Sequence, residues 1–183
     1  MIRLIRALSS LHGEQYTEPY IAKAKFERYG NLVGKGTHTN MMVEKEKAKF
    51  VLIIIDLYDN EIVLARLRIT LFLHATENLV LPGHHSMPKD VQVWRSFTKE
   101  AIYDFSKEAD DTNPIHLTDQ PIVQGLFLLR TLADYFGDIN SLEMKFIKPL
   151  YANQIVYLQK HSGEFIGYNG HEMIFKGKVD INK

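Results

Sequence analysis

The stretch PIVQGLFLLRTLADYFG, residues 121–137, decides the fold. Pro121 suits the first turn of a helix because its φ angle is fixed and it lacks an N–H, and Gly137 suits a helix end. Between Leu126 and Phe136, apolar side chains occupy nearly the whole helical circumference. A helix with this pattern is buried. We therefore expect a central helix that begins near Pro121 and is enclosed by the rest of the protein.

Strand-like runs follow this helix. The runs LEMKFIKPL (142–150), QIVYLQKHS (154–162), EFIGY (164–168) and HEMIFKGKVDI (171–181) are typical of short antiparallel strands. A buried helix followed by consecutive antiparallel strands fits one sheet wrapped around the helix. The pattern predicts an α+β domain over residues 88–183.

Another strand and helix precede the central helix. The run DVQVWRSF (90–97) alternates as a strand, and Thr98 follows it with a side-chain oxygen that can cap a helix. Glu100 in the first turn is favourable against the helix dipole. This helix must end before Asn113-Pro114, because proline disfavours helical geometry in the residue before it.

The first half of the chain, residues 1–87, is rich in strand signals. Residues 49–73 predict a long antiparallel hairpin that turns at Asp59-Asn60, and a connection with Gly and Pro places a boundary near residue 87. AKAKFERYG (22–30) weakly echoes LEMKFIKPL (142–150). This echo leaves open a duplication in which residues 1–87 form a degenerate second half that has lost its helix.

Composition excludes several classes of function. The chain has 183 residues, 45% of them hydrophobic, with 22 basic and 22 acidic side chains and no cysteine. We expect no nucleic-acid partner, because there is no net positive field and no basic run. No secretory signal or membrane-spanning stretch is present, so a cytoplasmic protein is expected. The pair His84-His85 lacks further ligands at suitable spacing, and we expect no metal and no cofactor.

A polar cluster precedes the central helix, in the sequence DDTNPIH (110–116). Asp111 and His116 are a carboxylate and an imidazole that can share one water molecule and act in general acid–base catalysis. Asn113 can orient the carboxylate or fix the turn. Gly125, near the helix start, can let a carbonyl oxygen approach free backbone N–H groups. The structural alternative is an ordinary polar turn followed by a glycine that permits close packing.

Three segments together resemble the MaoC-like dehydratases, which include (R)-specific enoyl-CoA hydratases of hot-dog fold. These segments are FSKEADDTNPIH (105–116), PIVQGLFLLRTLADYFG (121–137) and LEMKFIKPLYANQIV (142–156). The family pattern reads approximately S-G-D-x-N-P-[IL]-H, then P-[IV]-V-H-G-[ML], then F-x-x-P-[VL]-x-x-G-D. The resemblance covers roughly residues 90–160 and implies a hot-dog fold, in which an antiparallel sheet wraps around a long central helix.

The resemblance also implies roles for individual residues. Asp111 and His116 match the family's pair that holds the water added to a trans-2-enoyl thioester, and Asn113 matches the residue that supports the pair. Gly125 matches the glycine whose N–H polarises the thioester carbonyl. The substrate would be a coenzyme A or acyl-carrier-protein thioester, the product an (R)-3-hydroxyacyl thioester of fatty acid metabolism, and the assembly a homodimer. Substrate contacts are expected from Pro121, Ile122, Gln124 and Leu126.

The sequence departs from the family pattern at several positions. Asp110 replaces the glycine before the motif aspartate, and Gln124 replaces the histidine before Gly125. The segment between His116 and Gln124 is short, and PLYANQ lacks the usual Gly-Asp pair. A non-catalytic protein that binds or senses acyl thioesters therefore remains an alternative, as does a thioesterase on the same fold. If the first half is a fused copy, a monomer with an internal pair of halves replaces the homodimer.

Overall fold

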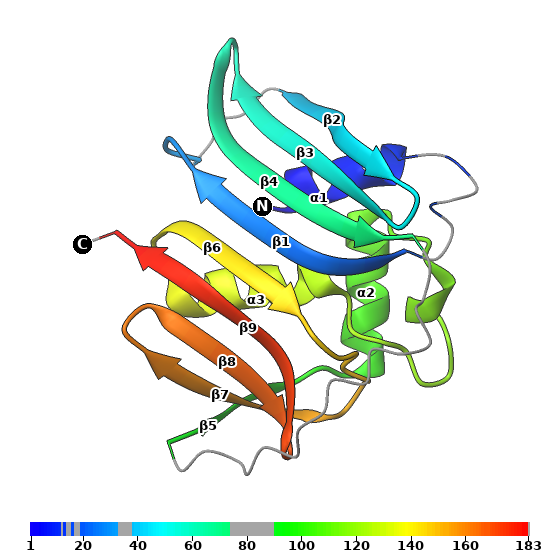
Figure 1. Cartoon of the computed structure of the whole chain (residues 1–183), viewed down its shortest axis with the longest axis vertical. Coiled ribbons are helices and arrows are strands. Elements are labelled where there is room, and N and C mark those ends of the chain that lie inside the picture. The colour runs from blue at the N-terminus through cyan, green and yellow to red at the C-terminus, as the bar shows by residue number, and fades with distance from the viewer. Residues whose placement is uncertain (12, 14–15, 17–18, 33–37, 74–89, 183) are drawn as a thin grey trace.

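One antiparallel sheet wraps around the central helix in this computed structural model (Figure 1). Along the sheet the strands lie in the order β2-β3-β4-β1-β6-β9-β8-β7-β5, and every neighbouring pair is antiparallel. The predicted α+β hot-dog fold is confirmed. The structure describes residues 1–11, 13, 16, 19–32, 38–73 and 90–182, so the predicted boundary near residue 87 and the pair His84-His85 lie outside it.

The described strands and helices have the following bounds. The strands are β1 (Tyr20–Arg28), β2 (His38–Lys47), β3 (Phe50–Asp59), β4 (Ile62–Phe72), β5 (Gln92–Ser96), β6 (Ile139–Phe146), β7 (Ile155–His161), β8 (Glu164–Asn169) and β9 (Glu172–Ile181). The helices are α1 (Ile2–Arg6), α2 (Lys99–Ala109) and α3 (Gly125–Phe136), with short 3-10 turns η1 (Ala7–Ser10) and η3 (Pro114–His116). In the described part of the chain, no helix has the length and apolarity needed to cross a bilayer.

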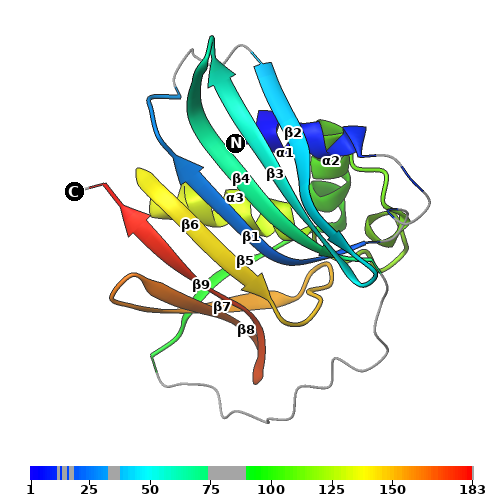
Figure 2. The ribbon, with the colours of Figure 1, turned by 45° about the horizontal axis from the view of Figure 1, so that its top comes forward.

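Helix α3 is the predicted central helix, and Figure 2 shows it behind the sheet, crossing β6 and β1. It begins at Gly125 rather than near Pro121. Residues 121–123 are used differently, because the Pro121 carbonyl accepts the Ala152 N–H at 3.0 Å and Ile122 forms an isolated bridge with Tyr151. These contacts pair residues 121–122 with the loop after β6. The helix therefore begins only after this paired segment.

One side of α3 reaches solvent, so the helix is not enclosed on every side. Leu129 and Leu132 are fully buried, whereas Asp134 and Tyr135 are exposed. The apolar pattern predicted burial correctly for the core-facing side. It overestimated the enclosure because Tyr135 counts as apolar in a helical pattern, although its ring can lie at the surface.

The two halves of the chain repeat one strand order. Counted from the centre of the sheet, the first half runs β1-β4-β3-β2 and the second runs β6-β9-β8-β7. The halves meet where β1 pairs with β6, and Ala24 lies opposite Met144 at that junction. These two residues are also equivalent positions in the echo between 22–30 and 142–150. The strand order supports our proposal that residues 1–87 are a reduced hot-dog half.

A short helix, α1, lies against the strands of the first half. Helix α1 has five residues, with Leu4 and Ile5 buried, and packs against β3, β4 and α2. Its apolar residues recur at helical spacing, but one turn of pattern is too short to distinguish from a loop. Among the described residues, the first half therefore has a short helix against its strands rather than a long central helix.

The predicted long hairpin is present as β3 and β4, but its turn is at Asn60-Glu61, one residue later than predicted, because Asp59 still pairs with Ile62. Asn60 has a φ angle of 55°, which asparagine tolerates better than most residues. Along β4, Ala65, Leu67 and Ile69 are fully buried on the core face. Buried and partly exposed side chains therefore alternate along this part of β4.

The cap of α2 gives a stability prediction. The Thr98 side chain accepts the Ala101 N–H at 3.2 Å, as its position in the sequence predicts. Replacing Thr98 with Ala removes this acceptor and should lower the free energy of unfolding by about 1 kcal/mol. Thr98→Ser keeps the hydroxyl and should stay close to wild type in urea denaturation. Equal stability of the Ala and Ser variants would contradict this account of the cap.

Candidate functional site

The turn after α2 places the first candidate residue, Asp111. Asp110 ends the helix in the left-handed conformation with φ 54°, and the Asp111 N–H donates to the Ser106 carbonyl at 2.9 Å. The Asp110 side chain is turned toward Arg6, whose Nε lies 3.3 Å from its Oδ2. The two neighbouring carboxylates thus have different surroundings, and a cation lies beside the first of them.

Asn113 holds the turn together through its backbone N–H and through both polar atoms of its side chain. Its backbone N–H donates to Asp111 Oδ1 at 3.1 Å, and its Oδ1 accepts the Ile115 N–H at 3.3 Å. Its Nδ2 donates to the Pro19 carbonyl at 3.2 Å, across to the segment that enters β1. Asn113 therefore orients the Asp111 carboxylate, begins η3 and connects the turn to the first half of the chain.

His116 is buried at the end of η3 and is fixed by one hydrogen bond. Its Nδ1 lies 2.7 Å from the Ile122 carbonyl oxygen. A carbonyl oxygen only accepts hydrogen bonds, so Nδ1 carries the proton and Nε2 of the neutral ring is an acceptor. Burial lowers the pKa of the His116 imidazole below its usual 6.5, and the Asp111 carboxylate only partly offsets this. The neutral ring is therefore the favoured form at neutral pH.

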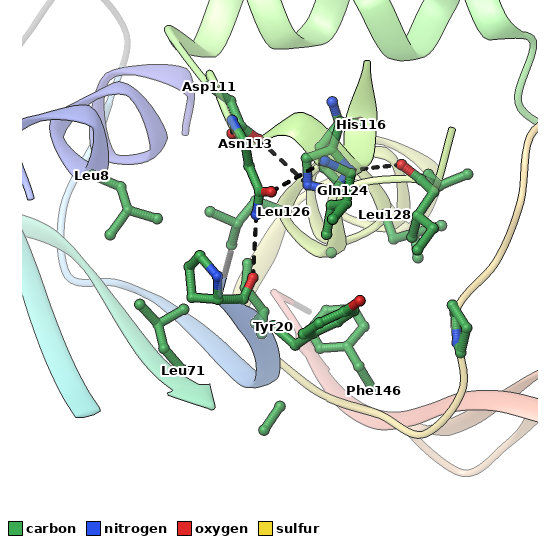
Figure 3. Close-up of a pocket in the computed structure, with 18 of the residues that line it drawn as sticks. Leu8, Tyr20, Leu71, Asp111, Asn113, His116, Gln124, Leu126, Leu128 and Phe146 are labelled. Atoms are coloured by element: carbon green, nitrogen blue, oxygen red, sulfur yellow. Dashed lines mark hydrogen bonds and ion pairs between the residues drawn. The ribbon is translucent and has the colours of Figure 1, made fainter. Parts of the chain in front are cut away.

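Asp111 and His116 face each other across a short gap (Figure 3). Asp111 Oδ2 lies 3.7 Å from His116 Nε2, which is too long for a direct hydrogen bond. With Nε2 unprotonated, both facing atoms are acceptors. A single water molecule can donate one O–H to each of them. The geometry thus provides a place where one water would be held by two bases.

Gly125 is the first residue of α3, where backbone N–H groups have no partner within the helix. A Cβ at this position would lie 3.1 Å from the Phe146 ring. The glycine therefore permits close packing between α3 and β6, which agrees with its structural interpretation. The same lack of a side chain leaves the helix N-terminus open toward the cavity that Gly125 lines.

Gln124 connects α3 to α2 from its position at the N-cap. Its Nε2 donates to the Ile102 carbonyl at 3.1 Å and to Ser106 Oγ at 2.6 Å, while its Oε1 is buried with no hydrogen-bond partner among the described residues. Gln124 also lines the cavity, as do Ile122 and Leu126. Pro121 is buried beside them but is not part of the cavity lining.

A cavity of about 890 Å³ brings these residues together with the first half of the chain. Figure 3 shows Asp111, Asn113 and His116 on one side of it and Leu8 and Leu71 on another. The apolar part of the lining includes Ile5, Leu8, Leu11, Leu71, Phe105, Leu126 and Leu128. This volume lies in the range of small-molecule sites, and its lining suits an apolar chain.

Sequence reasoning missed the contribution of the N-terminal segment to this cavity. The apolar residues of MIRLIRALSSL (1–11) have helical spacing, which signals an amphipathic segment. Nothing local indicates that this segment lies over a turn more than a hundred residues later. The Ile122 carbonyl was also missed, because a backbone acceptor leaves no trace in residue type.

Within the described residues, no group of three or more His, Asp or Glu side chains is placed to hold a metal ion.

Comparisons with known proteins identify solved structures of the same fold. The sequence matches no family model and no curated protein. The structure is similar to HtdX of Mycobacterium tuberculosis, with a TM-score of 0.70 at 12% identity over 98% of this chain and 87% of that one. It is similar to a MaoC-like dehydratase from Phytophthora capsici, with a TM-score of 0.62 at 16% identity over 94% and 75% of the two chains.

An acyl-ACP thioesterase from Bacteroides thetaiotaomicron is also similar. Its TM-score is 0.52 at 14% identity, covering 88% of this chain and 75% of that one. Identities this low establish the fold but not the reaction. The chain therefore has the hot-dog fold, and its structural neighbours include MaoC-like dehydratases and an acyl-ACP thioesterase.

Proposed function

We propose that the protein is a hydro-lyase that reversibly hydrates trans-2-enoyl thioesters to (R)-3-hydroxyacyl thioesters. The observation that carries this proposal is the 3.7 Å gap between two acceptors, Asp111 Oδ2 and His116 Nε2, at the wall of a largely apolar cavity. The MaoC-like neighbours support the same reaction class. The carrier of the thioester is coenzyme A or an acyl carrier protein.

The reaction requires one water molecule and one transferable proton. Held between Asp111 and His116, the water presents an oxygen lone pair to the β carbon of the substrate. As the C–O bond forms, the pair removes a proton from the water and then returns a proton to the α carbon. The hydroxyl and the hydrogen of one water are thereby added across the double bond. The reverse sequence dehydrates a 3-hydroxyacyl thioester.

Negative charge develops on the thioester oxygen during this addition, because the double bond is conjugated with the carbonyl. The N-terminus of α3 at Gly125 offers backbone N–H groups and a favourable dipole for this charge. A side chain at residue 125 would both press on Phe146 and obstruct that approach. We therefore assign Gly125 the role of oxyanion donor as part of the same proposal.

The acyl tail is proposed to lie against the first half of the chain. Leu8 and Leu71 line the cavity together with Leu126 and Leu128 of α3. Burial of a hydrocarbon tail there is favourable by about 0.8 kcal/mol for each methylene. The substrate class is thus a fatty acyl thioester with a chain longer than the reacting carbons alone.

A thioesterase is the second candidate, favoured by the similar acyl-ACP thioesterase structure. In that reaction the same water would attack the thioester carbonyl and release a free thiol. We rank it second because Asp111 and His116 together match the sequence pattern of water addition. Tight binding of acyl thioesters without any conversion would instead identify a non-catalytic binding protein.

Substitution of the two bases tests the proposed reaction. Asp111→Asn retains size but removes the negative acceptor, and His116→Asn retains a donor toward the Ile122 carbonyl but removes Nε2. Each change should lower kcat/KM for crotonyl-CoA hydration by about 100-fold or more, because general acid–base catalysis contributes that much. The reaction is followed by loss of the absorbance of the conjugated thioester.

Asp110→Asn is the matched control, since it makes the same chemical change one residue away. Asp110 is turned toward Arg6, so this variant should keep nearly the wild-type rate. Circular dichroism and thermal melting of all three variants establish that they fold. Wild-type rates in folded Asp111→Asn and His116→Asn proteins would exclude the proposed pair.

The lowered pKa of His116 predicts a pH dependence. Nε2 accepts a hydrogen bond only in the neutral ring, so activity should be lost as the pH falls through the folded-state pKa, which lies below 6.5. The acid limb of kcat/KM should therefore have its midpoint below pH 6.5. By linkage, the folded protein should also lose stability as the pH falls below 6.5, because the unfolded chain binds the proton more readily. An acid limb centred above pH 6.5 would contradict the assignment of the buried neutral ring.

The acyl pocket predicts a change in chain-length preference. Leu8→Trp fills part of the cavity and should leave hydration of crotonyl-CoA within about twofold of wild type. Turnover of a ten-carbon enoyl thioester should fall by about tenfold or more, because its tail loses apolar contact. Leu117→Trp, at an exposed leucine outside the cavity, is the control. A uniform loss for short and long substrates would argue against a tail site at Leu8.

A further inference from the structure

Three lysines form a row across three adjacent strands. Lys23 of β1 lies opposite Lys145 of β6, and Lys145 in turn lies opposite Lys176 of β9. Residues directly opposite each other share one face of a sheet, so the three side chains project from the same side. We call these residues the lysine row. Like charges in such positions destabilise a sheet unless another group compensates them.

The neighbouring row on the same face is built in the opposite way. Lys25 lies opposite Glu143, Glu143 opposite Lys178, and Lys178 opposite Glu164. Charges alternate along this row, and Lys178 Nζ lies 2.9 Å from Glu164 Oε1. Opposite charges therefore alternate along this row, whereas the lysine row contains like charges only.

The lysine row is also poorly neutralised by its surroundings. Lys23 Nζ pairs with Glu143 at 2.9 Å, whereas neither Lys145 nor Lys176 has an ion-pair partner within the described residues. Both of these lysines are exposed, so their charges are available to a ligand. The row thus contains two lysines without an ion-pair partner among the described residues, beside a third that has one.

All three members of the row line the same cavity as Asp111 and His116. Lys148, which pairs with Glu172 at 2.5 Å, also lines it and adds a fourth basic side chain. The cavity therefore combines a reactive pair, an apolar wall and a cluster of cations. A ligand that uses all three parts has a reactive group, an apolar chain and an anionic group in one molecule.

We propose that the lysine row binds the phosphate groups of a pantetheine carrier while the attached acyl thioester reaches Asp111 and His116. This inference rests on the proposed function, because it concerns the other end of the same substrate. Phosphates are multiply charged anions that Lys ammonium groups bind as point charges. Coenzyme A and a phosphopantetheinyl carrier share this chemistry and differ in the number of phosphates.

Equilibrium binding tests the inference without requiring turnover. Calorimetry would compare coenzyme A, 4′-phosphopantetheine and phosphate-free pantetheine on wild type and on the double variant Lys145→Ala/Lys176→Ala. The double variant should bind coenzyme A about tenfold more weakly, and the difference should shrink in high salt, because exposed charge interactions are screened. Its affinity for pantetheine should stay unchanged. If coenzyme A and 4′-phosphopantetheine lose affinity equally, the phosphate next to pantetheine is the bound group, and a larger loss for coenzyme A assigns the additional phosphates.

Lys178→Ala is the matched control, because Lys178 lies on β9, faces the same side as Lys176 and has its own partner in Glu164. It should bind coenzyme A within about twofold of wild type. Coenzyme A affinity that survives in the double variant, or an equal loss for pantetheine, would overturn the inference. These results are independent of hydration. A wild-type protein that binds through the row but hydrates nothing would contradict the proposed function alone.

Discussion

The antiparallel pairing of β1 with β6 is the contact on which the rest of the structure depends. It joins two sheets into one and places Ala24 opposite Met144. Because of this junction, the segment entering β1 reaches the turn after α2, where the Pro19 carbonyl accepts from Asn113. Arg6 of α1 makes a second connection by donating to the Glu108 carbonyl at 2.8 Å from one of its terminal nitrogens. Both halves of one chain thus build the cavity.

Within that frame, backbone groups determine the chemistry of the site. The Ile122 carbonyl fixes the proton of His116 on Nδ1, and the Asn113 N–H holds Asp111 Oδ1, which leaves Nε2 and Oδ2 facing each other. Burial keeps the ring neutral by lowering its pKa. Two acceptors that cannot bond to each other are suited to hold a water molecule between them. The proposed oxyanion donor is at the start of α3, so the helix that organises the core would also serve the proposed reaction.

The sequence predicted what depends on local pattern and missed what depends on long-range contact. The β3–β4 hairpin, the Thr98 cap and the central helix were predicted from alternation, capping and apolar periodicity. The start of α3 was placed too early, because the pairing of residues 121–122 with the loop after β6 is not visible in a helical pattern. The candidate pair was found because Asp111 and His116 are close in sequence. Leu8 and the lysine row belong to segments that are far apart in the chain. They line the same cavity only because the folded sheet brings these segments together.

The central claim is that the water held by Asp111 and His116 is added to a carbon–carbon double bond. The most direct test is mass spectrometry of a trans-2-enoyl thioester after incubation with the protein in oxygen-18-labelled water. Our account predicts a 3-hydroxyacyl thioester that carries one heavy oxygen on its hydroxyl group and retains the thioester bond. A free thiol with the heavy oxygen in the carboxylate would show attack on the carbonyl instead, and an unlabelled, unconverted thioester would show that the pair does not activate water.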